Sequence, residues 1–402
     1  MTIAKTIGIA GCGIGGLALG ALLSARGWKV QIFDQFAAPA PVGSGLVVQP
    51  VGLQVLQALG AAEAALAKGA RISHMYGLET GRDKVVLDVS YGARFGLAIH
   101  RASLFDVLLK VAVQGGCKIM SSTKIVGRKN DSFITQCGRQ NGPFDVLVDA
   151  SGASSVLSPL QSRALPYGAI WASVDWPENA PLPYNRLTQC YSRASKMAGV
   201  LPIGSLPHQS TRKAAIFWSL KVADFEAWQQ QPIDTWKAEA TAIWPDFAPF
   251  LAQISRHENM TMARYKHGTL SQKTAGNMAF IGDAAHCASP QLGQGANMAL
   301  LDAFALGSAL LALSVPRALQ SYNRSRHRHV LGYQLMSRFL TPLYQSDSGI
   351  LPWLRNHVFA PLSPHWPFAP VLTKVAAGDV IRPVRGQGLA LPLVPALPPH
   401  LP

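Results

Sequence analysis

The stretch Gly11-Cys12-Gly13-Ile14-Gly15-Gly16 decides how the amino-terminal part of this 402-residue chain folds. An apolar run at 6–10 precedes it, and an apolar segment at 14–25 follows it. A second apolar run at 29–33 then ends at Asp34. This order predicts a strand, a tight glycine turn, a helix and a second, parallel strand. In that setting a G-x-G-x-x-G pattern binds a dinucleotide.

Each glycine of this turn has its own role in such a site. Gly11 allows the tight turn, Gly13 lets the backbone approach a pyrophosphate, and Gly16 lets the helix pack closely against the strand. The helix points its free N–H groups and its positive dipole end at the phosphates. Asp34 is placed to accept hydrogen bonds from two ribose hydroxyls. The residues predicted to bind the dinucleotide here are Gly11, Gly13, Ile14, Gly15, Gly16, Asp34 and Gln35.

A second glycine cluster lies far downstream, at 282–286, and continues through Pro290 to the segment 293–297. Two nucleotide-type clusters in this order indicate one long cofactor held at both ends, and we expect that cofactor to be FAD. Helix N-termini stabilise negative charge, and glycines at 293 and 295 let the backbone come close to a ligand. We expect His286 to be a hydrogen-bonded structural histidine rather than a catalytic one.

These motifs resemble those of the flavoprotein aromatic hydroxylases typified by para-hydroxybenzoate hydroxylase, and the resemblance extends to about residue 378. It implies that Asp283 holds the ribityl chain and that Arg101 begins a helix and contacts the cofactor. It also implies that Pro290, Gly293 and Gln294 form the flavin environment, with no side-chain acid or base assigned. The cofactor-binding residues implied in this half are Arg101, Ser151, Gly282, Asp283, Gly293, Gly295, Ala296 and Asn297.

The chain departs from the family pattern at Ser151-Gly152, where the family usually has Asp-Gly. Serine keeps hydrogen-bonding capacity but carries no charge. We therefore expect FAD binding to survive, while use of NADH or NADPH as electron donor is less secure. Asp149 lies two residues earlier, and either compensates or belongs only to the strand end.

The predicted fold class is α/β, with a discontinuous Rossmann-like FAD-binding domain, an inserted mainly β substrate domain and a helical carboxyl-terminal part. The FAD-binding domain is expected at 1–70, 99–160 and 265–378, and the substrate domain at 71–98 and 161–264. The remaining residues, 379–402, are rich in proline and are expected to be extended and poorly packed. The apolar stretch 296–315 is interpreted as a buried helix rather than a transmembrane segment, because it contains Asp302 and follows the glycine turn directly.

Charge and cysteine content limit the function classes further. The formal net charge is +15, yet the basic residues are scattered except at 324–329, which we interpret as a solvated helix face rather than a phosphate or partner patch. No zinc spacing or aromatic-basic interleaving supports nucleic-acid binding, and no metal is expected. The five dispersed cysteines, an odd number without C-x-x-C, indicate thiols in a reducing cytoplasm. We expect a monomer or a homodimer.

No motif assigns the substrate pocket, which by family analogy lies between the inserted sheet and the flavin. Aromatic and cationic residues on alternating strand positions suit a flat, anionic substrate. The candidates are Tyr191, Arg193, Phe217 and Trp218, although each also fits a plain core or surface role.

The resemblance implies an FAD-dependent NAD(P)H monooxygenase that hydroxylates an aromatic or conjugated ring with O2, through a flavin C4a-hydroperoxide. One alternative is a flavin-dependent reductase of a prenyl or other hydrophobic substrate. A halogenase on the same scaffold is disfavoured, because the W-x-W-x-I-P pattern is absent. A third hypothesis, from a different class, is a non-catalytic flavoprotein that binds a partner or a hydrophobic ligand.

Overall fold

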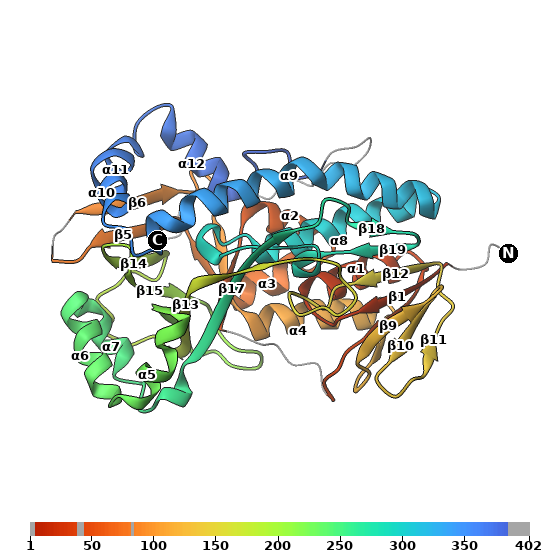
Figure 1. Cartoon of the computed structure of the whole chain (residues 1–402), viewed down its shortest axis with the longest axis horizontal. Helices are drawn as coiled ribbons and strands as arrows, with labels where there is room; N and C mark the ends of the chain where they lie inside the picture. The colour runs from red at the N-terminus through yellow and green to blue at the C-terminus, as the bar shows by residue number, and fades with distance from the viewer. Residues whose placement is uncertain (1–4, 38–43, 82–83, 385–402) are drawn as a thin grey trace.

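The computed structural model describes residues 5–37, 44–81 and 84–384. Its first layer is a six-stranded sheet in the order β18-β19-β12-β1-β2-β8, parallel throughout except for β18 (Figure 1). The strands are β1 (Thr6–Ala10), β2 (Lys29–Phe33), β8 (Lys118–Met120), β12 (Val146–Asp149), β18 (Thr274–Ala275) and β19 (Met278–Phe280). The apolar side chains of β1, β2, β12 and β19 are buried on both faces, as expected for a parallel sheet covered by other layers, while Met120 on the edge strand β8 is exposed. The predicted strand-turn-helix-strand unit is confirmed.

Three helices form the main core beside this sheet: α1 (Ile14–Ser24), α4 (Arg101–Gln114) and α8 (Gly295–Ala312). The helix α1 can approach its neighbours closely because Gly20 lies against Ile32 and Gly307 lies against Leu22. By length and composition α8 is apolar enough to cross a membrane, but two thirds of it is buried between α1, α2 (Pro50–Ala58) and α9 (Val315–Tyr344). It is therefore a core helix, as the sequence predicted.

The second layer is an eight-stranded sheet in the order β20-β17-β13-β16-β15-β14-β5-β6. The strands are β5 (His74–Glu79), β6 (Val85–Ser90), β13 (Arg163–Asp175), β14 (Arg186–Ser192), β15 (Lys196–Pro202), β16 (Lys213–Lys221), β17 (Thr261–Thr269) and β20 (His286–Cys287). Segments far apart in the sequence therefore share one sheet. The division into a cofactor domain and a substrate domain stays a prediction.

The two faces of this sheet pack against different partners. On β16, Ile216 and Trp218 point toward α5 (Phe225–Gln230), α6 (Ile233–Ile243) and α7 (Ala248–Leu251), while Ala215 and Phe217 point to the opposite face. Trp228 lies on α5 and Trp236 lies on α6, and both side chains are buried. Trp244 is also in this core, but it follows α6 and precedes the turn η2 (Pro245–Phe247) rather than lying within a helix.

Smaller elements connect the layers. A three-stranded sheet joins β3 (Gly45–Val48), β7 (Gly96–His100) and β4 (Ala70–Ile72), and α3 (Ala62–Lys68) packs beside it. Another contains β9 (Ile125–Lys129), β10 (Ser132–Thr135) and β11 (Gln140–Asn141). The strand β10 ends at Thr135, shortly before the chain turns at Gly138, which has φ of +81°.

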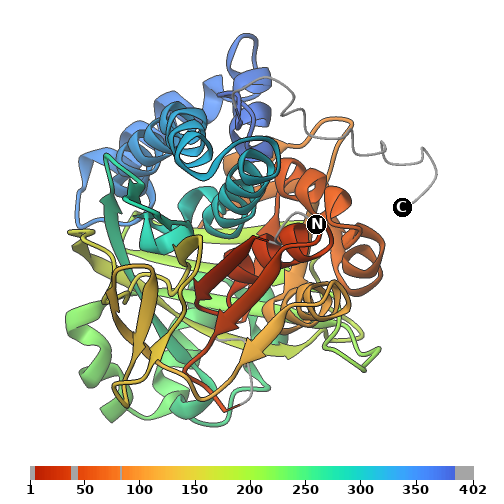
Figure 2. The ribbon, with the colours of Figure 1, turned by 90° about the vertical axis from the view of Figure 1, so that its right-hand side faces the viewer.

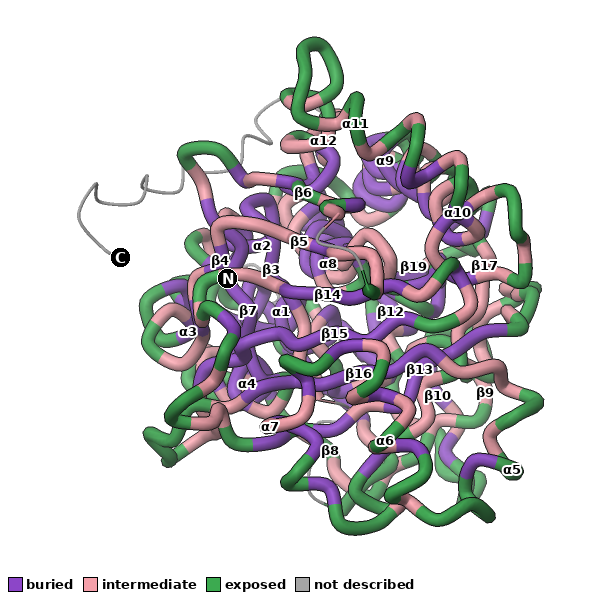
Figure 3. The backbone as a smooth tube through the Cα atoms, turned by 90° about the vertical axis from the view of Figure 1, so that its left-hand side faces the viewer, coloured by how far each residue is buried: buried purple, intermediate pink, exposed green. Residues whose placement is uncertain are grey.

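The carboxyl-terminal helices lie at one end of the molecule and α5–α7 lie at the other (Figures 2 and 3). After α9 come α10 (Ile350–Leu354), a π-helical turn η6 (Arg355–Phe359), α11 (Ala360–Leu362) and α12 (Phe368–Ala377). The expected poorly packed tail is corrected at its start. Asp379 pairs with Arg94 at 2.5 Å, the Pro383 carbonyl accepts from Arg326, and Val384 is buried. Residues 385–402 lie outside the described residues.

Candidate cofactor and substrate site

The first glycine turn has the geometry that the motif predicts. Gly11 has φ of +109°, and a Cβ there would lie 2.4 Å from the Ala150 carbonyl oxygen. A Cβ on Gly16 would lie 2.1 Å from the carbonyl oxygen of Gly11, so the helix can start this close to the strand only with glycine. Gly13 is different, since no described atom lies within 4 Å of the place its Cβ would take. The N-terminus of α1 is therefore open beside Gly13, where a pyrophosphate is expected, whereas Gly15 is buried against Ile281 and Ala299.

Asp34 ties the end of β2 to this turn. One carboxylate oxygen accepts from the Cys12 N–H at 3.0 Å and the other accepts from the Phe36 N–H at 2.9 Å. A carboxylate has about four acceptor positions, so capacity remains for ribose hydroxyls. Gln35 is exposed beside it. Ribose binding by these two residues stays a prediction.

Arg101 and Asp283 come from opposite halves of the chain and interact electrostatically. Solvent reaches both side chains. Nevertheless, burial lowers the pKa of the Arg101 guanidinium and raises the pKa of the Asp283 carboxyl, and each charge partly opposes the shift of the other. Groups that are accessible yet desolvated face a cleft rather than an open surface. Such a pair can bind a polar chain that carries both phosphates and hydroxyls.

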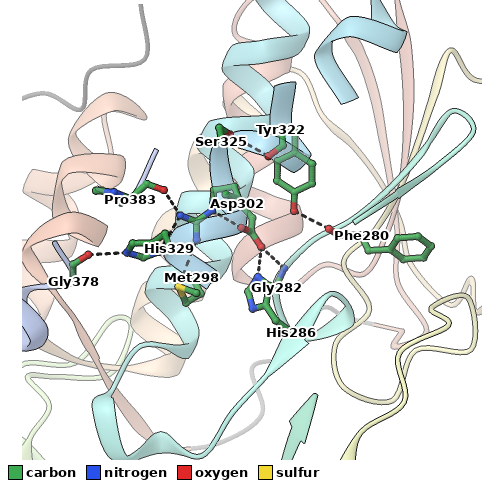
Figure 4. A network of polar contacts seen from close by, with 11 residues as sticks. Phe280, Gly282, His286, Met298, Asp302, Tyr322, Ser325, His329, Gly378 and Pro383 are labelled. Carbon is green, nitrogen blue, oxygen red and sulfur yellow. Dashed lines mark hydrogen bonds and ion pairs between the residues drawn. The ribbon is translucent and has the colours of Figure 1, made fainter. Parts of the chain in front are cut away.

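A buried network holds the turn η4 (Gly282–Ala284) in place (Figure 4). Asp302, on α8, accepts from the Gly282 N–H at 3.0 Å, lies 2.6 Å from the His286 Nε2 and accepts from the Arg326 Nε at 2.7 Å. Gly282 has φ of +59°, which favours glycine. The predicted structural role of His286 fits this pairing. Because Asp302 contacts both Gly282 and His286, it fixes the backbone on either side of Asp283.

The same network corrects the interpretation of the basic run 324–329 as one solvated face. Arg324, His327 and Arg328 are exposed, but Arg326 and His329 are buried. Although burial raises the pKa of the Asp302 carboxyl, His286 and Arg326 hold it well below its usual value. Burial and the Arg326 charge lower the pKa of His329 to about 3. Its Nδ1 lies 3.1 Å from Arg326 and its Nε2 lies 2.8 Å from the Gly378 carbonyl, so neutral His329 accepts from the first and donates to the second.

The second glycine segment is anchored to β3 through Asn297. Its Oδ1 accepts from the Gln49 N–H at 2.8 Å, and its Nδ2 donates to the carbonyls of Val47 and Gly293 at 3.1 and 3.0 Å. Pro290 begins the turn η5 (Pro290–Leu292) and is exposed, and Gly293 closes that turn with φ of +59°. The segment 293–297 therefore lies against the end of β3.

An unpaired amide marks this junction. Gln49 is buried, and its Oε1 accepts from the Tyr91 hydroxyl at 2.6 Å. Its Nε2 has no hydrogen-bond partner among the described residues and lies 3.0 Å from where a Cβ on Gly293 would stand. A buried donor without a partner is costly, and a ligand acceptor removes that cost. The open Gly13 turn, the Arg101–Asp283 pair and this amide fit a long dinucleotide such as FAD.

Three further predicted residues, Gln294, Gly295 and Ala296, lie at the start of α8. The side chain of Gln294 donates to the Ala376 carbonyl at 3.1 Å and so contacts α12, which leaves its backbone to face the turn. Gly295 is exposed at the first position of α8, and Ala296 is half-buried beside it. The Gly295 position is open within 4 Å in the described structure, which suits a ligand at this helix N-terminus.

Ser151, which stands where the family usually has aspartate, donates hydrogen bonds to Asp149. The Ser151 N–H and hydroxyl donate to Asp149 Oδ1 at 3.0 and 2.5 Å, and the Ser155 hydroxyl donates to Oδ2 at 2.5 Å. Asp149 is fully buried. Its carboxylate organises the turn after β12, which is the second of the two roles that the sequence left open. Ser151 itself is exposed, next to Gly11.

The structure separates the four substrate candidates. Trp218 lies in the core against Trp236, on the sheet face that the helices α5–α7 cover. Phe217 is on the other face and packs against Trp171, with ring centroids 4.5 Å apart and ring planes tilted by 31°. Tyr191 shares that face but is fully buried between Tyr344 and Arg355. Arg193 is exposed in the turn between β14 and β15, with φ of +58°.

The sequence reasoning missed two residues of this second face. Trp171, on β13, donates from its Nε1 to the Tyr265 hydroxyl on β17 at 3.2 Å, and both side chains are partly accessible. Trp171 packs on the cluster that contains Val47, which Asn297 contacts. No local motif marks either residue, because their pairing depends on the register between two strands.

The turn η5 also contacts this part of the sheet. Gln291 lies 3.3 Å from Gln345, whose Nε2 donates to the Gly168 carbonyl on β13 at 3.0 Å. Gln345 therefore links the turn η5 to β13, the strand that also carries Trp171. A substrate pocket at this junction stays a prediction.

Known proteins resemble this chain in sequence and in fold. Residues 4–334 match the family model of a FAD binding domain, which covers most of the chain. A 3-hydroxybenzoate 6-hydroxylase from Polaromonas naphthalenivorans (strain CJ2) is 24% identical over 383 residues, 89% of this chain and 92% of the relative. The aurachin C monooxygenase/isomerase from Stigmatella aurantiaca is 26% identical over 381 residues, 90% and 96% of the two chains.

Solved structures show the same fold. A variant of 2-methyl-3-hydroxypyridine-5-carboxylic acid oxygenase superposes with a TM-score of 0.78 at 21% identity, covering 95% of this chain and 98% of the other. Klebsiella pneumoniae HpxO, complexed with FAD and uric acid, gives 0.77 at 18% identity, with 93% and 97% covered. None of these relatives is named a prenyl reductase, so that alternative is not favoured. The chain belongs to the FAD-binding family of flavoprotein aromatic hydroxylases, the class A flavoprotein monooxygenases, and its cofactor is FAD.

Proposed function

We propose that this monooxygenase hydroxylates a flat ring that already carries an oxygen substituent, bound between η5 and the sheet face of Trp171 and Tyr265. When bound, FAD would supply the redox chemistry, in which a hydride from NADH or NADPH reduces the flavin, one atom of O2 is inserted into the ring and the other leaves as water. The protein's own residues bind and orient the ring and exclude water.

The observation that supports this pocket best is the pair of Trp171 and Tyr265. Burial raises the pKa of the Tyr265 phenol to about 12, so it stays protonated at neutral pH. Because its oxygen accepts from Trp171, its own proton is available to an acceptor on the substrate. Phe217 packs against Trp171, with the two ring planes tilted by 31°. This arrangement suits a phenol oxygen or a ring carbonyl above an aromatic floor.

The named relatives support the same substrate class. One hydroxylates 3-hydroxybenzoate, and a structural neighbour was solved with uric acid. Both are flat rings with oxygen substituents. Hydroxybenzoates, hydroxypyridines and hydroxyquinolones are therefore the substrates to test first.

Several finer features belong to this proposal. We retain 1–70, 99–160 and 265–378 as the cofactor domain and 71–98 and 161–264 as the substrate domain, although β20 and most of β17 extend the eight-stranded sheet into the cofactor domain. We retain Asp34, Arg101, Asp283 and the segment 293–297 as FAD ligands. All five cysteines are free thiols and four are buried, which supports a cytoplasmic location. A monomer or a homodimer is proposed, with Ser151 affecting only the efficiency of the nicotinamide donor.

The test begins with FAD-loaded protein under anaerobic conditions. NADH and NADPH are each added with members of the ring panel, and the rate of flavin bleaching is recorded. A ring that accelerates bleaching is then turned over with ¹⁸O2, and mass spectrometry of the product should show one added ¹⁸O atom. If no ring in the panel accelerates bleaching and none gains oxygen, the proposal is wrong and a non-catalytic flavoprotein is the better description.

The variant Tyr265→Phe tests the pocket itself. Loss of the phenol proton should lower kcat/KM for the ring about tenfold, the usual worth of one buried hydrogen bond. FAD affinity should not change. As a control, Tyr184→Phe alters a tyrosine that packs on Trp176 and should leave turnover unchanged. An unchanged kcat/KM in Tyr265→Phe would place the substrate elsewhere.

A further inference from the structure

The longest helix, α9, presents one straight exposed stripe. At about 100° per residue, positions 317, 324, 328, 331, 335 and 339 fall within about 40° of one line along the helix. All six side chains are exposed, whereas Tyr322, Arg326, His329 and Tyr333 on the opposite side are buried. We call the six residues the α9 stripe: Arg317, Arg324, Arg328, Leu331, Leu335 and Phe339.

The stripe changes chemistry along its length of about 33 Å. Its first half carries three arginines, which line a shallow groove of about 590 Å³. Its second half is apolar, with Leu335 58% and Phe339 65% exposed. The inward face of α9 already makes the core contacts. The fold therefore does not require large apolar side chains on the outward face.

The apolar half continues into the helices that follow. Among the described residues, ten of the seventeen large exposed hydrophobic side chains lie between 331 and 371, and Trp366 is 85% exposed. The helices α10, α11 and α12 gather at the same end of the molecule as the carboxyl-terminal half of α9 (Figures 1 and 3). Such a concentration marks an interaction surface rather than scattered exposure.

Charge indicates the kind of partner. Between 303 and 378 the sequence contains one acid, Asp347, and that residue pairs with Lys221 at 2.8 Å. The same stretch contains seven lysines and arginines, of which only Arg326 and Arg355 are buried. The partner must therefore offer negative charge beside an apolar layer.

We propose that the α9 stripe, together with the exposed side chains of α10–α12, docks this protein on the surface of an anionic lipid bilayer. Arginines pair with anionic headgroups, while leucine, phenylalanine and tryptophan enter the boundary of the acyl chains. A second copy of the chain is a poorer occupant, since the one acid between 303 and 378 is already paired with Lys221, so that two copies would mostly bring cations against cations or against apolar groups. A nucleic acid would leave the apolar half exposed. The docking does not depend on the proposed hydroxylation.

The test is co-sedimentation of the FAD-loaded protein with vesicles of phosphatidylcholine, with or without about one third phosphatidylserine. Binding should require the anionic lipid and weaken with salt. The charge variant Arg324→Glu/Arg328→Glu and the apolar variant Leu335→Ser/Phe339→Ser should each lower the partition coefficient at least about tenfold. The control Val113→Ser removes an exposed apolar side chain from α4 and should bind as the original protein does.

Light scattering on the same samples separates the other outcomes. Failure to bind anionic vesicles, or equal binding to both vesicle types, overturns the proposal. A stable dimer that Leu335→Ser/Phe339→Ser converts to a monomer also overturns it, because a second copy would then cover the stripe. Flavin absorbance of each variant shows that it is folded.

Discussion

The cofactor side and the substrate side of the molecule are built on opposite principles. On the cofactor side, short motifs fix the backbone: Gly11, Gly16 and Gly282 hold positions where a Cβ would clash or where φ is positive. On the proposed substrate side, side chains from strands far apart in the sequence meet through register, as Trp171 and Tyr265 do. Local sequence therefore predicts the first site far better than the second.

Adjacent residues of β16 show how sharp this limit is. Phe217 and Trp218 are both aromatic, buried and plausible as pocket residues from composition alone. The pleat turns Phe217 toward Trp171 and turns Trp218 toward Trp236 on the helical side. A difference of one position decides whether a ring faces the cofactor side or the opposite core.

The largest effect should come from the glycine turn. In Gly16→Ala the Cβ meets the Gly11 carbonyl, and backbone cannot move aside cheaply. We expect FAD to bind about 100-fold more weakly or more, with a lower Tm of the FAD-free protein. Fluorescence titration and thermal unfolding measure the two.

Gly13→Ala is the matched control, because its Cβ enters open space in the FAD-free protein. Stability without FAD should stay within about 1 kcal/mol, while FAD affinity falls because the pyrophosphate needs that space. Unfolding of Gly13→Ala, or an unchanged FAD affinity, would mean that the glycines of this turn serve only packing. The cofactor site would then not be defined by a short ligand-binding motif, and the contrast with the proposed substrate side would no longer hold.

Arg326→Met should have the next largest effect. It removes a buried cation that pairs with Asp302 and also donates to the Pro383 carbonyl. Breaking one partner of a buried pair costs about 3–5 kcal/mol, measured as the free energy of unfolding in urea. Arg328→Met, two residues away on the exposed face, should change it by no more than about 0.5 kcal/mol. If Arg326→Met and Arg328→Met lower the free energy of unfolding equally, the buried network around Asp302 does not stabilise the fold more than an exposed arginine does.

Acid should weaken the same network through His329. Its folded pKa, about 3, lies below the ordinary value of 6.5, so the unfolded chain takes up the proton first as pH falls. The contribution of neutral His329 is therefore complete above about pH 6.5 and is lost on acidification, by about 2 kcal/mol at pH 5.

Urea unfolding at pH 7.5 and pH 5 measures this change in the free energy of unfolding. His329→Gln keeps both a donor and an acceptor but cannot titrate. Its free energy of unfolding should therefore fall by about 2 kcal/mol less between the two pH values than that of the original protein. His327→Gln, exposed on the same helix, should retain the full loss. The same loss in His329→Gln as in the original protein would place the acid sensitivity in other groups.

The network also shows what could be read in the sequence and what could not. Asp302 in an apolar helix and the basic run 324–329 were both visible, and helical periodicity puts Arg326 and His329 on one face. Their partnership could not be read, because it depends on how α8 and α9 pack. Gln49 is a similar case, since its unpaired amide has meaning only beside Gly293.

The smallest and most discriminating effect compares two tryptophans on neighbouring register positions. Trp171→Phe keeps the aromatic floor but loses the N–H that orients Tyr265. If the proposed pocket is right, KM for the ring substrate should rise about threefold to tenfold, with stability changed by less than about 1 kcal/mol. Trp218→Phe should do the reverse, costing about 1–2 kcal/mol in a packed core while kcat/KM stays the same. If Trp218→Phe alters KM as strongly as Trp171→Phe, the two faces of the sheet are coupled, and pleat alternation alone does not separate substrate binding from core packing.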